Sequence, residues 1–89
     1  MKLKIITVDT QLERDGCDYI TLDIADDKKG GFSGSYGIKK GHARAIFCLR
    51  QGKVTAQRQG EVIFCAEVSD GFATVENDVV SVTVDRAAF

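Results

Sequence analysis

The stretch EVIFCAEVSDGFATVENDVVSVTVD, residues 61–85, decides the fold predicted for this chain. Apolar and polar side chains alternate along it with a period of two, which is the pattern of β-strands. The pairs Asp70-Gly71 and Asn77-Asp78 interrupt this alternation, and such dipeptides supply the positive φ angles that tight hairpins require. The stretch therefore predicts an antiparallel ladder of three strands, turned at Gly71 and at Asn77.

The same alternation extends upstream and predicts an antiparallel meander over the second half of the chain. ARAIFCL, residues 43–49, is predicted as one strand, and KVTA, residues 53–56, as the start of the returning strand. Between them Gln51-Gly52 predicts a turn, and RQG at residues 58–60 predicts the next one. No segment here has the period of a helix.

The first half of the chain is less regular. KLKIITV at residues 2–8 and YITLDI at residues 19–24 are predicted as strands because they are rich in β-branched residues. Residues 9–18 between them are polar and predict a connection. Residues 25–35, ADDKKGGFSGS, combine three glycines with four consecutive charges and predict a long loop rather than the interior of a strand.

Length and composition limit the architecture. A chain of 89 residues can support one core only, so residues 1–89 are predicted as a single domain. The hydrophobic fraction of 44 % is typical of a folded soluble domain. We therefore predict an all-β fold, a two-sheet antiparallel β-sandwich or flattened barrel of about 8–10 short strands.

Charge and hydropathy exclude two classes of partner. The formal net charge is −1 with both signs interspersed, so nucleic acid is not an expected partner. The longest uncharged apolar run, VIFCA at residues 62–66, is far shorter than the ~20 residues of a membrane span. Asp9 lies where a signal peptide would still be apolar, so no export signal is expected.

The cysteines predict no disulfide framework. Cys17, Cys48 and Cys65 are odd in number and form no CxxC pair, which favours a reducing compartment. Cys48 and Cys65 each lie inside an apolar stretch, so both are predicted to be buried. A catalytic thiolate pair would need His42 beside one of them, but nothing nearby supplies an oxyanion-stabilising turn or a third, orienting residue.

The sequence also gives little support for metal binding, phosphate binding or acid–base catalysis. A lone histidine with separated cysteines lacks the short paired spacings of a metal site. GGFSGSYG, residues 30–37, is similar to a phosphate-binding glycine loop but lacks the strand-to-helix context. Asp26 and Asp27 are adjacent and point apart, which does not suit general acid and base catalysis. No catalytic, cofactor-binding or metal residue is predicted, and the default is a binding or structural module.

Two segments carry a resemblance to a known family. GIKKGHA, residues 37–43, resembles the G-I-x-P-G-H-A element of the N-terminal β domain of the epsilon subunit of F-type ATP synthases. Residues 52–87 resemble that domain's later strands and turns, through Gly71, Phe72, Val75, Asn77, Val82, Thr83, Val84, Asp85 and Ala87. The resemblance covers nearly the whole chain, but Lys40 and Arg44 replace the family's prolines and the loop before Gly37 is longer than usual.

The resemblance implies a noncatalytic rotor subunit without a cofactor. Such a domain grips the gamma subunit on one side and rests on the ring of c subunits, coupling proton or sodium flow to ATP synthesis. It implies the cytoplasmic face of a bacterial inner membrane, in preference to the organellar equivalent, with the membrane met only through the complex. In most members a C-terminal helical hairpin follows this domain, whereas the present chain stops at Phe89.

By the same resemblance five positions are expected to contact the c-ring: Ser33, Gly34, Ser35, Tyr36 and His42. Gly41 permits a sharp turn, and His42 could bond its own backbone with one ring nitrogen and offer the other outward. An alternative of equal weight is that His42 only pins its own loop.

A rotor subunit also requires an apolar patch on one sheet face. Ile6 with Val8, or Ile63 with Cys65, is compatible with such a patch. The alternative function is a stand-alone β-sandwich binding module that uses the glycine-rich loop 25–35.

Overall fold

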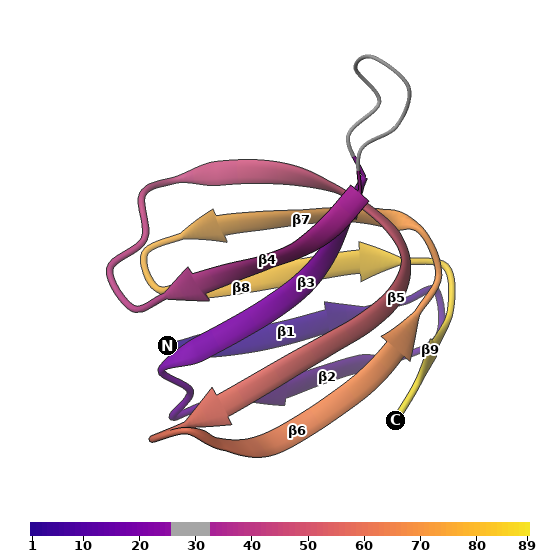
Figure 1. The fold of residues 1–89 in the computed structure, drawn as a ribbon. Helices are drawn as coiled ribbons and strands as arrows, with labels where there is room; N and C mark the ends of the chain where they lie inside the picture. The colour runs from indigo at the N-terminus through magenta and orange to yellow at the C-terminus, as the bar shows by residue number, and fades with distance from the viewer. Residues whose placement is uncertain (26–32) are drawn as a thin grey trace.

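The chain forms nine strands in the computed structural model, which describes residues 1–25 and 33–89. Within these residues no helix is long and apolar enough to cross a membrane. Figure 1 shows the strands. Their bounds are β1 Lys2–Ile6, β2 Gln11–Arg14, β3 Tyr19–Ala25, β4 Ser33–Lys39, β5 Ala45–Arg58, β6 Glu61–Val68, β7 Gly71–Glu76, β8 Val79–Val84 and β9 Ala87–Ala88.

The nine strands make one hydrogen-bonded sheet that folds over into two layers without closing into a barrel (Figure 1). The first layer has the order β2-β1-β8-β7 and ends on the first half of β5. The second layer has the order β4-β3, followed by the second half of β5, β6 and β9. The all-β sandwich expected from the sequence is therefore confirmed.

One expected turn is absent because the long strand β5 runs through it. The sequence predicts that the chain reverses at Gln51-Gly52. Instead, both residues lie within β5, a strand of 14 residues that passes from one layer to the other. A Cβ at Gly52 would collide with the side chain of Asp23, so glycine serves here for close approach. Asp23 Oδ2 accepts the N–H of Lys53 at 2.9 Å, where the β3–β5 register shifts.

A second expected turn, at Asp70-Gly71, is also not formed. β6 pairs with β5 and β9, whereas β7 pairs with β5 and β8, so the chain crosses between layers here and forms no hairpin. Gly71 is the first residue of β7, and a Cβ there would collide with the carbonyl oxygen of Thr83. The predicted three-strand ladder is thus wrong at its first turn. At its second, Asn77 and Asp78 form a two-residue turn with φ of 53° and 61°.

Pairing and boundaries differ from expectation in the first half as well. β1 pairs with β8 in parallel, so the sandwich is not antiparallel throughout. β2 lies inside the segment expected to be a polar connection, and it is a mostly exposed edge strand that pairs with β1. Ala25 and residues 33–35 belong to strands rather than to a loop. The remainder of that predicted loop, residues 26–32, lies outside the described residues.

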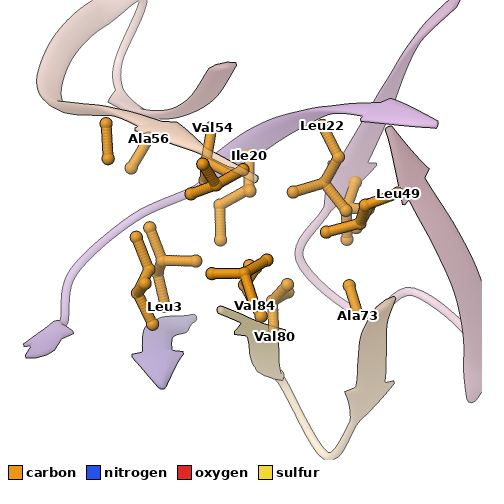
Figure 2. Close-up of a cluster of buried hydrophobic side chains, with 14 of the residues drawn as sticks. Leu3, Ile20, Leu22, Leu49, Val54, Ala56, Ala73, Val80 and Val84 are labelled. Atoms are coloured by element: carbon orange, nitrogen blue, oxygen red, sulfur yellow. The ribbon is translucent and has the colours of Figure 1, made fainter. Parts of the chain in front are cut away.

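The core lies between the two layers and consists of aliphatic side chains (Figure 2). Leu3 of β1 and Val80 and Val84 of β8 face Ile20 and Leu22 of β3. These residues alternate with half-buried ones because successive side chains in a strand point to opposite faces. Within the described residues no polar or charged residue is buried, so burial of apolar area supplies the stability of the core.

Replacement of Gly71 by alanine tests the close packing of β7 on β8. The new Cβ would overlap a backbone oxygen, which cannot move away as a side chain can. We expect Gly71→Ala to lower the free energy of unfolding by about 2 kcal/mol or more in urea denaturation. Gly60→Ala is the control, because Gly60 has open space around it and only its φ of +81° opposes alanine, at a cost of about 1 kcal/mol. Equal stability of Gly71→Ala and wild type would contradict this account.

Candidate functional site

The connection between β4 and β5 is a tight turn at one end of the sandwich (Figure 1). Gly41 adopts φ of +82°, a conformation that glycine reaches without strain. The N–H of His42 donates to the carbonyl of Lys39 at 3.1 Å and closes the turn. The β7–β8 turn lies beside it, because Gly41 and His42 line one open depression together with Arg44, Glu76, Asn77 and Asp78.

His42 uses both ring nitrogens inside the molecule. Nδ1–H donates to the carbonyl oxygen of Ala43 at 2.6 Å, since a carbonyl can only accept. In the neutral ring Nε2 is then an acceptor, and the hydroxyl of Tyr36 donates to it at 3.0 Å. The expectation that His42 offers one nitrogen outward is therefore wrong, and the geometry is that of a histidine that pins its own turn.

Tyr36, His42 and Phe47 form one aromatic cluster between β4 and the first half of β5. The rings of Tyr36 and Phe47 lie 4.7 Å apart, and His42 lies edge-on to Tyr36 at 5.9 Å. Both separations are in the range of favourable aromatic pairs. The cluster covers one open side of the sandwich. On the opposite side, Arg14 of β2 lies over the ring of Phe64 of β6 at 5.1 Å.

The five expected ring-contact positions do not all meet. Tyr36 and His42 are in direct contact, but residues 33–35 lie toward the other end of β4. A strand of seven residues spans about 20 Å, so Ser33 and His42 are at different ends of it. The four positions on β4 share one edge, because within the described residues β4 pairs with β3 alone, and His42 follows in the connection to β5. We call residues 33–36, Gly41 and His42 the β4 edge.

The outer surface of the first layer carries exposed apolar side chains. Cys48 of β5 lies opposite Phe72 of β7, and Phe72 lies opposite Thr83 of β8, which lies opposite Ile6 of β1. Ile46 is 75 % exposed, Phe72 47 % and Val8 87 %. We call Ile6, Val8, Ile46, Cys48 and Phe72 the outer apolar face. Sequence reasoning noted Ile6 and Val8 but missed the others, because only the β5–β7 register brings them together.

Charged pairs flank the outer apolar face on two sides. Lys4 and Glu13 lie 3.9 Å apart on the β1–β2 side, and Arg44 and Glu76 lie 3.8 Å apart at the end of β7. Ile63 and Cys65, the other expected patch, are exposed on β6 and lie between Glu61 on one side and Glu67 on the other. The outer apolar face is therefore the more continuous hydrophobic surface of the two.

The cysteines are arranged differently from expectation. Cys48 and Cys65 are exposed, so their predicted burial is wrong, and the buried thiol is Cys17. Burial raises the pKa of Cys17 above its usual value. Cys48 alternates with Phe47 along β5 and therefore faces away from the His42 cluster. In the described part of the chain no three histidine, cysteine or acidic residues lie close enough to hold a metal ion.

Comparison with known proteins gives three findings. Residues 1–89 match the family described as ATP synthase, Delta/Epsilon chain, beta-sandwich domain. An ATP synthase epsilon chain of Magnetococcus marinus is 42 % identical over 59 residues, which is 66 % of this chain and 42 % of the relative. An ATP synthase epsilon chain of Chromohalobacter salexigens is 42 % identical over 57 residues, which is 64 % of this chain and 40 % of the relative. The alignments thus span about two fifths of these relatives.

A solved structure has the same fold. It is a cryo-electron microscopy structure of the central stalk and c-ring of the Tetrahymena thermophila mitochondrial ATP synthase. The match has a TM-score of 0.68 and 16 % sequence identity, and covers 97 % of this chain and 63 % of that one. At this identity the likeness concerns the fold alone.

The hydrogen bonds of His42 predict one tautomer. We expect ¹⁵N NMR of the neutral ring to show a protonated Nδ1 and an unprotonated Nε2. Tyr36→Phe removes the donor to Nε2 but keeps the ring, so it should shift the Nε2 resonance and lower stability by about 0.5–1.5 kcal/mol. Tyr19→Phe, at the other tyrosine, is the control and should leave the His42 resonances unchanged. A proton on Nε2 in the wild type would contradict the assignment.

Proposed function

This chain belongs to the family of ATP synthase delta and epsilon chain β-sandwich domains, and on that premise we propose that it is a noncatalytic rotor-stalk subunit of an F-type ATP synthase. It binds the gamma subunit and the c-ring and couples proton or sodium flow to ATP synthesis. Its two bacterial relatives support a location at the cytoplasmic face of a bacterial inner membrane, which the chain meets only through the complex. The observation that carries the proposal is the outer apolar face.

The outer apolar face suits a permanent protein partner. A stable interface buries about 800 Å² on each side and has an apolar centre with a polar rim. Phe72 supplies such a centre with Ile46 beside it, and the pairs Lys4–Glu13 and Arg44–Glu76 lie at its margins. The sheet beneath is rigid, because its inward side chains are fully packed in the core. We assign this face to the gamma subunit.

The β4 edge suits the second partner. Residues 33–35 are serine, glycine and serine on an edge strand, and small residues let another chain approach the backbone closely. His42 has both ring nitrogens occupied, so it would contact a partner through its ring surface rather than through a new hydrogen bond. We assign residues 33–36 and His42 to the c-ring.

Matched substitutions of two exposed isoleucines test the gamma assignment. Ile46→Asp would place a charge on the outer apolar face, and Ile63→Asp makes the same change on β6. We expect the first to weaken binding to recombinant gamma subunit at least tenfold, in isothermal titration calorimetry, and the second to leave it within about twofold. The reverse result would move the gripping surface to β6. If the folded wild type does not bind gamma, the stand-alone binding module becomes the better hypothesis.

A second matched pair tests the ring assignment. Ser35 is exposed on β4, and Thr55 lies two strands further in on the same layer. Ser35→Arg should weaken binding to purified c-rings about tenfold because the long charged side chain would keep the ring from the edge strand. Thr55→Arg should leave ring binding unchanged, and neither should affect gamma. Equal loss with both variants would indicate that the sheet face, and not the β4 edge, meets the ring.

A further inference from the structure

Asp78 links two connections that are far apart in the sequence. Its side-chain Oδ1 accepts the backbone N–H of Gly41 at 2.7 Å, across a separation of 37 residues. Its own carbonyl accepts the N–H of Lys2 at 2.9 Å, at the start of β1. One residue of the β7–β8 turn is thereby bonded both to the turn that carries His42 and to the first strand.

We propose that Asp78 is a positioning residue that holds the Gly41–His42 turn in the orientation in which it meets the c-ring. This rests on the ring contact proposed above and names a residue that neither sequence reasoning nor the family match assigns to it. Because Asp78 belongs to the first layer and the turn follows β4 of the second, the hydrogen bond joins the β4 edge to the layer that carries the outer apolar face.

The hydrogen bond from Asp78 acts on the Gly41 end of the turn, which has no side-chain packing of its own. Gly41 is exposed, and a Cβ added to it would meet nothing within 4 Å. A carboxylate that accepts from a backbone N–H makes a stronger bond than a neutral acceptor does. Arg44 and Glu76 also join the two connections, but their side chains are 81 % and 58 % exposed and contribute little. Asp78 is therefore the principal tie between the two turns among the described residues.

A simpler account is that an aspartate stands at this position only because the turn requires positive φ. Asp78 has φ of 61°, a conformation open to glycine, asparagine and aspartate. Two substitutions separate the accounts, because both tolerate this φ. Asp78→Asn keeps an Oδ1 acceptor for the N–H of Gly41, whereas Asp78→Gly removes it.

The experiment compares these two variants of the 89-residue chain with wild type. Ring binding is measured on purified c-rings in detergent, gamma binding by calorimetry, and exchange of the Gly41 amide proton by NMR. We expect Asp78→Gly to expose the Gly41 amide to exchange and to weaken ring binding about three- to tenfold, with gamma binding unchanged. Asp78→Asn should remain within about threefold of wild type in all three measurements.

Three outcomes would have distinct meanings. If Asp78→Gly exposes the Gly41 amide but binds the ring like wild type, the positioning role is overturned. If Asp78→Asn loses ring binding as fully as Asp78→Gly, the hydrogen-bond account is overturned, because the acceptor is still present. If wild type itself does not bind the ring, the proposed ring contact fails and the positioning role fails with it. Urea denaturation of both variants checks that their stabilities are comparable.

Discussion

The architecture depends on one strand that belongs to both layers. β5 pairs with β7 over residues 45–49 and with β6 over residues 52–58, so the chain must bend between the two. At the bend the ladder to β3 shifts register, and Asp23 Oδ2 takes the N–H of Lys53 that the ladder leaves free. The carboxylate thereby supplies, at the bend, the acceptor that the ladder does not provide. Gly52 leaves the space that the carboxylate occupies.

Each surface of interest follows from that bend. Because β5 leaves the first layer after Leu49, its first half ends that layer as an edge and presents Ile46 beside Phe72. Because its second half pairs with β3 and β6, β4 remains at the outer edge of the second layer. The gap between these two edges is the side that Tyr36, His42 and Phe47 cover. The outer apolar face and the β4 edge are therefore two consequences of one strand path.

The sequence predicts the strands and their inward faces well because alternation is a local property. The alternation of Val80, Val82 and Val84 along β8 requires no knowledge of the partner strand, and all three are buried. Pairing is not local, and it is where prediction failed. Gln51-Gly52 and Asp70-Gly71 have the composition of hairpin turns, but their glycines serve for close approach instead. Gly52 approaches the side chain of Asp23, and Gly71 approaches the carbonyl of Thr83. The parallel pairing of β1 with β8 joins the two ends of the domain and leaves no mark in either strand.

Prediction of the candidate site from the sequence is limited in the same way, because its contacts are not local. A family resemblance led to His42, but its tie through Gly41 to Asp78 spans 37 residues and is visible only in three dimensions.

Ile46 and Phe47 are neighbours on β5, yet Ile46 points to the outer apolar face and Phe47 to the His42 cluster. If gamma binds the first and the c-ring the second, a force applied at the ring contact reaches gamma through adjacent residues of one strand. The Asp78 bond provides a second route, from the turn into β8 and β1. Both routes cross hydrogen-bonded strands and a closely packed core, which resist deformation. The described part of the sandwich is thus suited to transmit a force between the two proposed contacts.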